Sequence, residues 1–299
     1  MKQLVVLSGK GGTGKTCVTA AFAHLAAQGE LANQVILADA DVDAANLELV
    51  LQPQMREQQD FKGGKVAVID ADSCSGCGVC ETVCRFDAIH PGAGSYVVDP
   101  IACDGCAACV YQCPSESISL REQIAGRFFF SESRYGPLYH ANLFAGQENS
   151  GKLVTLVKQR ARLQALDENR ALVIVDGPPG IGCPVISAVS GASLTLIVAE
   201  PTVSGVHDMR RVLQTVKHFG VRAVVCINKA DIHPAGADEI EAYCRENGIE
   251  TVGRIPFDLT VAGAMVAGEA VTAFQPQAPA SRAIQEIWRR VLPSLLDGI

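Results

Sequence analysis

The 299-residue chain has no apolar run of about eighteen residues, and this excludes a helix that crosses a membrane. It also lacks clustered basic residues. The net charge is -7, and because nucleic-acid phosphates are bound by lysine and arginine, we expect no nucleic-acid partner. The first residues, MKQLVVLSG, form too short an apolar run for a signal peptide. With 48% hydrophobic residues, the composition predicts a well-packed protein instead of a disordered one.

Cysteine, in contrast, is abundant. The chain has twelve cysteines, and eight of them lie between Cys74 and Cys113. In a secreted protein this number would indicate disulfides. The missing signal sequence and the tight clustering favour metal ligation instead. We therefore expect a reducing compartment, most simply the cytoplasm.

Apolar runs of strand length alternate with longer helical patterns along most of the chain. The runs are apolar nearly throughout, as a parallel sheet covered on both faces requires. The alternation predicts a doubly wound, mostly parallel α/β sheet with right-handed crossovers, and ligands of such sheets bind beyond the carboxyl ends of the strands. The predicted strands span residues 3–9, 34–41, 171–179, 194–201 and 222–231, and the predicted helices span 14–29, 207–219 and 237–247.

Between residues 64 and 120 this periodicity gives way to Cys, Gly, Asp and Pro. The halves of this region, DADSCSGCGVCETVCRFDAI and DPIACDGCAACVYQCPSESI, share their cysteine spacing and a trailing isoleucine. They indicate an internal duplication. We predict two domains: a doubly wound α/β domain made of residues 1–63 and 121–299, and a small inserted α+β domain of residues 64–120.

Gly9-x-x-x-x-Gly14-Lys15-Thr16 follows a predicted strand and opens a predicted helix, which is the context of a phosphate-binding loop. Glycines let backbone N–H groups curl around phosphate oxygens. Lys15 neutralises the β- and γ-phosphate charge, and the Thr16 hydroxyl can reach Mg²⁺. The residues predicted to bind the nucleotide are Gly11, Gly12, Thr13, Gly14, Lys15, Thr16 and Cys17.

Lys10 is a second lysine with no role in the ordinary loop. The segment KGGTGKT resembles the deviant Walker A loop of the MinD/ParA/nitrogenase iron protein family, and the resemblance extends over nearly the whole chain outside the insert. It implies a P-loop ATPase that uses ATP and forms a homodimer with ATP at the interface. In that family the early lysine reaches across to the partner's nucleotide, where a cation stabilises charge on the transferred phosphoryl group.

Two further segments resemble the switches of the same family. ADADVDAANLELV resembles the first switch, which implies that Asp39 belongs to the Mg²⁺ shell and that Asp41 orients the attacking water. Either aspartate could instead cap the following helix. VIVDGPPGIG resembles the Walker B strand and second switch, which implies that Asp176 lies near the metal. Gly177 and Gly180 would let the backbone approach the γ-phosphate and move when it leaves.

The base of the nucleotide is assigned by weaker resemblances. INKAD places Asn228 where the family hydrogen-bonds adenine. RIPFDLTVAGAMVAGEAV resembles the base-proximal loop, which implies that Pro256 and Asp258 lie near the purine.

The cysteines of the insert follow the spacing of two-cluster bacterial ferredoxins, C-x₂-C-x₂-C-x₃-C, in both runs. In that pattern each cubane takes three thiolates from one run and the fourth from the other. The predicted [4Fe–4S] clusters are bound by Cys74, Cys77, Cys80 and Cys113, and by Cys84, Cys103, Cys106 and Cys109. Zinc is the alternative, but structural zinc sites take their ligands in pairs. Arg85 stands where the pattern usually has proline, and it either tunes the reduction potential or is simply exposed.

Four cysteines lie outside this pattern. Cys17, Cys226 and Cys244 fall in predicted helices or strands, which favours small core residues. Cys183 follows the second switch. A cluster shared between subunits would need two cysteines from each, so we expect Cys183 to be a structural thiol.

Two segments have no assigned role. Residues 126–154 are rich in aromatic side chains and either dock the insert or a partner, or form a strand pair that covers the sheet edge, which we favour. The C-terminal SRAIQEIWRRVLPSLL is amphipathic, and its few basic residues predict a packed helix without membrane attachment. Its apolar face consists of Ile284, Ile287, Trp288, Val291 and Leu295.

Together these features predict an ATPase that couples nucleotide-driven dimerisation and switch motion to electron transfer through two clusters. The acceptor would be an unidentified redox or iron–sulfur protein. Two alternatives stay open: an iron–sulfur cluster assembly or carrier ATPase, and a MinD-like positioning ATPase with a redox-sensing insert. The ferredoxin spacing argues against a carrier, because it encloses fully ligated clusters.

Overall fold

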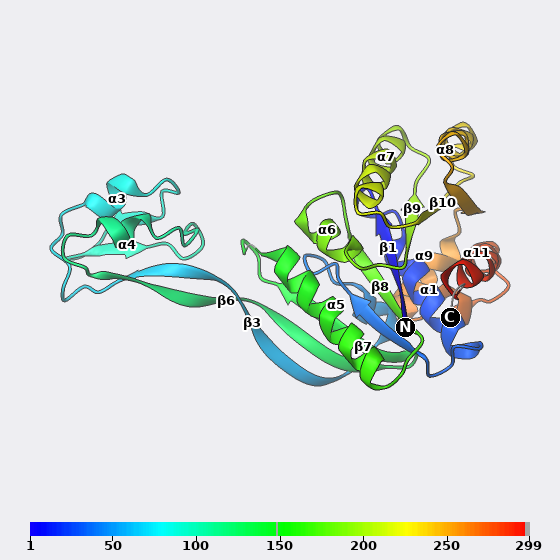
Figure 1. Ribbon diagram of the computed structural model, residues 1–299, viewed down its shortest axis with the longest axis horizontal. Helices are drawn as coiled ribbons and strands as arrows, with labels where there is room; N and C mark the ends of the chain where they lie inside the picture. The colour runs from blue at the N-terminus through cyan, green and yellow to red at the C-terminus, as the bar shows by residue number, and fades with distance from the viewer. Residues whose placement is uncertain (148, 297–299) are drawn as a thin grey trace. The chain divides into compact units, whose positions relative to one another are not determined.

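The computed structural model describes residues 1–147 and 149–296. The chain divides into two compact units (Figure 1). The first consists of Met1–Gln58, Phe128–Asn142 and Ser150–Ile299, and the second of Gln59–Arg127 and Leu143–Asn149. The predicted insert, residues 64–120, lies within the second unit. That unit begins earlier, ends later and also includes the stretch that leads into α5.

The described residues form one nine-stranded sheet, in the order β11-β10-β9-β1-β8-β2-β7-β6-β3. From β11 to β7 every pair is parallel, which confirms the predicted mostly parallel α/β sheet. Its strands are β1 (Lys2–Ser8), β2 (Val35–Asp39), β3 (Gln54–Ile69), β6 (Ile118–Ser133), β7 (Gly136–Leu143), β8 (Leu172–Pro179), β9 (Leu194–Ala199), β10 (Ala223–Asn228) and β11 (Glu250–Ile255).

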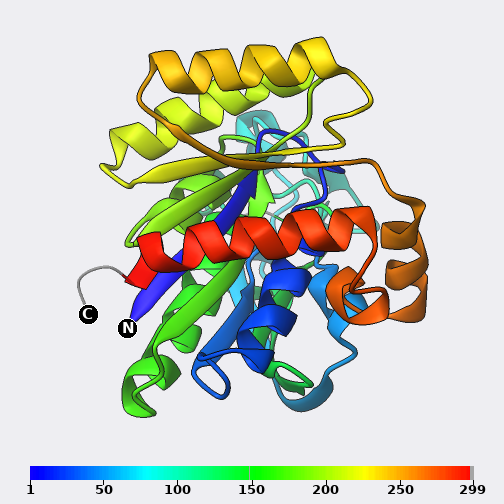
Figure 2. The same cartoon turned by 90° about the vertical axis from the view of Figure 1, so that its right-hand side faces the viewer.

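Helices cover both faces of this sheet in the first unit. On one face, α1 contacts α2, α10 and α11, and Figure 2 shows α11 (red) lying beside α1 (blue). On the other, α5 packs on α6 and α7 on α8. The helices are α1 (Lys15–Gln28), α2 (Leu47–Leu51), α5 (Ser150–Asp167), α6 (Cys183–Val189), α7 (Val203–His218), α8 (Pro234–Glu246), α9 (Leu259–Ala267), α10 (Val271–Phe274) and α11 (Pro279–Leu296).

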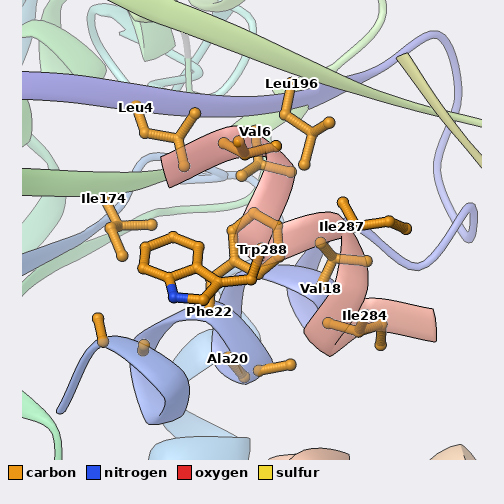
Figure 3. Close-up of a cluster of buried hydrophobic side chains, with 14 of the residues drawn as sticks. Leu4, Val6, Val18, Ala20, Phe22, Ile174, Leu196, Ile284, Ile287 and Trp288 are labelled. Atoms are coloured by element: carbon orange, nitrogen blue, oxygen red, sulfur yellow. The ribbon is translucent and has the colours of Figure 1, made fainter. Parts of the chain in front are cut away.

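The core of the first unit lies between the sheet and α1 and α11. The rings of Phe22 and Trp288 have centroids 4.8 Å apart and lie against strand residues such as Ile174 (Figure 3). All five residues of the predicted apolar face of α11 are buried, so the expectation of a packed terminal helix is confirmed. Among the described residues, no helix is long and apolar enough to cross a membrane.

The segment 126–154 is a strand pair followed by the start of a helix. Two residues separate β6 from β7, so these neighbours form an antiparallel hairpin. The expected strand pair is confirmed, and it covers the β2 edge of the predicted parallel strands. β7 pairs with β2 inside the sheet, and the outermost strand on that side is β3. Both β3 and β6 continue from the first unit into the second.

The second unit repeats itself. It contains α3 (Val79–Val83), α4 (Ala108–Gln112) and the antiparallel pair β4 (Ile89–Pro91) and β5 (Tyr96–Val98). α3 and α4 have the same length, and each ends at a cysteine in extended conformation, Cys84 and Cys113. The left-handed residues also correspond, since Gly76 (φ 70°) matches Gly105 (φ 72°), and Asp87 (φ 49°) matches Glu116 (φ 48°). The sequence duplication is therefore also a duplication of backbone conformation.

Candidate functional site

The loop between β1 and α1 forms one wall of a cavity of about 400 Å³. Gly12 (φ 77°) and Gly14 (φ 95°) are left-handed. A side chain at Gly14 would also collide with the Asn228 amide, because a Cβ there would stand 2.4 Å from Nδ2. The first turn of α1 has no side-chain cap, so its backbone N–H groups are free to meet an anion. Of the predicted residues, Gly11, Gly12, Gly14, Lys15, Thr16, Cys17, Asp41, Asn228, Pro256 and Asp258 line the cavity.

The carboxylates predicted to hold magnesium lie side by side on two adjacent strands, β2 and β8. Asp39 of β2 and Asp176 of β8 are register partners, and both are fully buried. Burial and the neighbouring Asp176 raise the pKa of Asp39 well above its ordinary value, and burial also raises the pKa of Asp176. The Thr16 hydroxyl donates to Asp176 at 2.6 Å. Oxygen ligands and closely spaced negative charge suit Mg²⁺, so these three residues fit the predicted metal.

Asp39 also has a structural contact. Its carboxylate accepts hydrogen bonds from the backbone N–H of Asp41 (3.1 Å) and of Leu47 (3.0 Å), the first residue of α2. The hydrogen bond from Leu47 supports the alternative role of Asp39 as a helix cap. Asp39 makes this contact while it lies beside Asp176.

Asp41 and Lys15 form a nearly buried pair in the cavity. The Lys15 ammonium lies 3.4 Å from the Asp41 carboxylate. Burial raises the pKa of Asp41 to about 6, although the nearby Lys15 opposes this rise. A phosphate entering the loop would compete with Asp41 for Lys15 and free the carboxylate to orient a water molecule.

Lys10 is bound within its own chain. Its ammonium lies 2.9 Å from the Glu200 carboxylate and 3.2 Å from the Thr202 hydroxyl. Lys229 pairs with the same carboxylate at 2.6 Å and also donates to the carbonyl of Gly12 in the loop. Sequence reasoning did not identify Glu200 or Lys229, because their partners are distant in the chain.

The residues predicted to contact the base already have partners. Asn228 donates from Nδ2 to the Thr13 carbonyl at 2.7 Å, and Thr13 itself is buried. Asp258 accepts from the backbone N–H groups of Thr260 and Ala280, so it caps α9. Pro256 lines the cavity without such a role.

An apolar wall that sequence reasoning missed completes the cavity, formed by Phe257, Leu259, Val261, Met265 and Ile284. Cys17 belongs to it and lies 3.3 Å from the Met265 sulfur. The expectation that Cys17 is a core residue is therefore wrong, whereas Cys226 and Cys244 are buried as expected. The unusually apolar sequence of α9 was the available signal, since a helix apolar on all sides needs a partner or a ligand.

The cysteines of the second unit gather crosswise into two sets. The first cysteine set, Cys74, Cys77, Cys80 and Cys113, lines one small cavity, and the second cysteine set, Cys84, Cys103, Cys106 and Cys109, lines another. Each set thus takes three cysteines from one run and the fourth from the other. Among the described residues, no three Cys, His, Asp or Glu side chains form a group that could hold a metal ion. A four-iron cluster binds each thiolate at a different iron, so its ligands surround a volume instead of one point.

Polar groups point at the sulfur atoms of both sets. The backbone N–H of Ala88 lies 3.4 Å from the Cys84 sulfur, and that of Ala67 lies 3.5 Å from the Cys103 sulfur. The Ser117 and Ser115 hydroxyls help to lower the pKa of Cys113 to about 7. Donors of this kind stabilise thiolates, the form in which cysteine binds metals.

Comparisons with known proteins place the chain in a family. Residues 4–271 match the model of the CobQ/CobB/MinD/ParA nucleotide binding domain. The uncharacterized protein MJ0578 of Methanocaldococcus jannaschii is 34% identical over 228 residues, which cover 76% of this chain and 78% of that protein.

Two solved structures share the fold. The MinD cell division protein of Aquifex aeolicus is 21% identical with a TM-score of 0.59, over 98% of this chain and 97% of that one. The septum site-determining protein MinD of Pyrococcus horikoshii, complexed with Mg-ADP, is 17% identical with a TM-score of 0.55, over 97% and 95%. The chain belongs to the CobQ/CobB/MinD/ParA nucleotide-binding family and is a P-loop ATPase.

Proposed function

We propose that this protein is an ATP-driven switch in which the second unit carries two [4Fe–4S] clusters and responds to the nucleotide bound by the first. The observation that carries the proposal is the crosswise sorting of eight cysteines into two sets of four. Spacing alone predicts this sorting for two cubanes, and a pair of zinc sites would not require it. We also propose a cytoplasmic location, since free thiols persist in reducing compartments.

The chain's own residues supply the parts that phosphoryl transfer needs. Lys15 and the loop N–H groups would hold the β- and γ-phosphates, while Thr16, Asp39 and Asp176 would hold Mg²⁺ directly or through water. Magnesium, when bound, neutralises charge on the phosphate oxygens. Asp41 would orient the attacking water once the phosphate takes over Lys15. Positioning and charge neutralisation supply most of the catalysis in such reactions.

Lys10 would complete the site of a partner chain in a homodimer with ATP at the interface. For this it must exchange Glu200 and Thr202 for a phosphate of the partner's nucleotide. Complementation tests the role. Lys10→Ala and Lys15→Ala should each be inactive alone, but their mixture should regain hydrolysis, because a mixed dimer has one complete site. If Lys10 acts within its own chain, mixing restores nothing.

Two outputs of the switch are compatible with this arrangement. The solved structures named above are MinD proteins, which favours an ATPase that positions other proteins and whose second unit senses redox state. Clusters, when bound, exchange single electrons. Electron delivery to a redox or iron–sulfur acceptor is the second candidate, and contact between α3 and α4 favours it because it places the two sets in adjoining halves. A carrier of labile clusters has the least support, since each set offers four cysteines.

Metal content is the first test of the clusters. Protein purified without oxygen should contain about eight iron and eight sulfide per chain, as two cubanes require. Zinc without sulfide would overturn the cluster proposal. The electron paramagnetic resonance spectrum of the reduced protein should change with MgATP in the natural protein but not in Lys15→Ala. The exposed Lys152→Ala serves as the matched control.

Redox control of hydrolysis then separates the two outputs. A sensor should hydrolyse ATP, or recruit its partner, at different rates in the oxidised and reduced states without net electron flow. An electron donor should reduce an acceptor only while hydrolysable ATP is present. If hydrolysis and the cluster spectrum are independent of each other, the proposed coupling is wrong.

A further inference from the structure

Lys158 of α5 is a buried lysine with an unusual set of partners. The residue is 6% exposed, and among the described residues no carboxylate pairs with it. Its ammonium donates instead to three backbone carbonyls, those of Ser187 (2.9 Å), Ser190 (2.8 Å) and Ala188. These carbonyls lie at the C-terminal end of α6, where backbone acceptors have no partner within the helix.

This arrangement costs more stability than an apolar side chain would. Burying an ammonium without a counter-ion is unfavourable, and hydrogen bonds to neutral carbonyls recover only part of the loss. Burial lowers the pKa of Lys158 to about 8, and Arg162 on the same helix adds to this effect. The negative end of the α6 dipole favours the charged form. Hydrogen bonds are directional, so these contacts fix the position of α6 relative to α5 more closely than apolar packing would.

The helix that Lys158 holds follows the second switch directly. β8 ends at Pro179, which lines the nucleotide cavity, and α6 begins at Cys183. Between them, Gly180 (φ 90°) donates its N–H to the carbonyl of Ser8, where β1 enters the phosphate loop. The backbone thus passes from the cavity to α6 within a few residues.

The other end of α6 also rests on α5. A Cβ added at Gly151 would stand 3.4 Å from the Cys183 Cβ and 3.3 Å from the Ser187 hydroxyl, so the two helices approach closely there. α5 therefore contacts α6 at both of its ends. A displacement of α5 would therefore be transmitted to the second switch.

We propose that Lys158 is a positioning residue for ATP hydrolysis: by binding the last carbonyls of α6 it fixes the second switch beside the γ-phosphate. The connection of α5 to the second unit has a further consequence, which rests on the proposed function. α5 begins immediately after Leu143–Asn149, which belongs to the second unit. A change in that unit would therefore reach the switch through α5 and Lys158.

Lys158→Met tests the proposal, because it keeps an unbranched side chain of nearly the same length and removes the donors. We expect the turnover number to fall roughly 10- to 100-fold, as small misplacements of catalytic groups do. Nucleotide affinity should change less than about twofold, since the phosphate loop is untouched. Cys183 is the exposed first residue of α6, so its alkylation by a maleimide reports the position of the helix. In the natural protein the alkylation rate should depend on MgATP. In Lys158→Met the alkylation should become severalfold faster and no longer depend on MgATP.

Two control variants separate positioning from stability. Lys152→Met changes an exposed lysine of the same helix and should alter nothing. Val157→Ala removes a buried neighbour, and it should lower the melting temperature while turnover and Cys183 labelling stay normal. Peptide mass spectrometry distinguishes Cys183 from the other thiols.

The proposal is overturned if Lys158→Met behaves like Val157→Ala, with reduced stability but normal turnover and labelling. Should the methionine variant not fold, Lys158→Gln retains amide donors and should show the same changes at smaller size. A folded glutamine variant with natural turnover and natural Cys183 reactivity would equally refute the role. Iron content and the cluster spectrum remain separate readouts, so failure here leaves the proposed function standing.

Discussion

The first unit is held together by aliphatic and aromatic side chains, whereas the second has little apolar material to bury. The large core of the first unit runs from the central strands to Phe22 and Trp288. In the second, the buried cluster consists of Ala67, Cys80, Ile89, Cys109 and Ile118. Two of these five are cysteines. So small a core supplies little stability, and small domains with weak cores commonly add disulfides or a metal.

The two units therefore differ in the source of their stability. The first should be stable whatever the state of its thiols, since its cysteines are not needed as ligands. The second should be stable only when its cysteine sets are filled, because binding free energy at such sites is folding free energy. Nucleotide and cluster would then stabilise different parts of one chain.

Removal of iron should produce the largest effect. If a chelator and an oxidant strip the proposed clusters, residues 59–127 should lose their protection from proteolysis and hydrogen exchange, because little else holds them. The first unit should keep its protection and its affinity for an ATP analogue. Mass spectrometry of both units in one sample provides the measurement. A second unit that stays protected without metal would remove the basis of the comparison.

Paired cysteine substitutions should have the next largest effect and test the crosswise sorting. Cys74→Ser with Cys113→Ser damages only the first cysteine set, so about half of the iron should remain. Cys74→Ser with Cys84→Ser damages both sets, although these residues belong to one run, and should lose nearly all of it. Equal iron in the two double variants would contradict the sorting.

In the first unit, Phe22→Ala should destabilise the fold by about 3–5 kcal/mol, as truncation of a buried aromatic ring does. Urea unfolding followed by fluorescence measures this, since Trp288 is the only tryptophan and its ring packs on Phe22. Leu163→Ala, at an exposed position of α5, should change stability by less than about 0.5 kcal/mol. Iron content should be normal in both. Loss of iron from Phe22→Ala would show that the units do not stabilise themselves separately.

The smallest effect is expected where β3 and β6 pair. Lys62 and Glu122 form an ion pair at 2.7 Å, but both side chains are well exposed. Exposed pairs of this kind contribute little because water and salt screen them. Glu122→Gln should leave the urea midpoint, the iron content and the turnover number within error of the natural protein. A measurable loss of iron would assign these strands a larger role in holding the second unit.

Five of the parallel strands, β1, β2, β8, β9 and β10, could be predicted because each is buried almost throughout and reads as a continuous apolar run. β11 was not predicted, because exposed residues interrupt its apolar ones. The long strand β3 could not be predicted. The first part of β3, MREQQD, is exposed at every residue, so no period-2 pattern marks it. α5 was missed for a different reason. Its buried stripe contains Lys158, and a charged residue inside an apolar stripe hides the periodicity.

The residues of the candidate site also fall into two groups, those that the sequence predicts and those that it does not. Loop residues and cysteine sets are encoded by short spacings, so the sequence places them without knowledge of tertiary contacts. The ion pair between Lys10 and Glu200 joins residues far apart in the chain, and no local pattern predicts it. The apolar wall around Met265 likewise arises only when α9 meets α1.

The matched backbone of the two halves has a consequence for any shorter form of the second unit. Each half carries four thiols but donates its last one, Cys84 or Cys113, to the opposite set. A peptide of one half alone would supply three ligands to its own cubane and present the fourth outward. Two such peptides related by a twofold axis would exchange these thiols and rebuild the whole. If the cysteine sets hold the proposed cubanes, the crosswise pattern therefore predicts that an isolated half dimerises reciprocally.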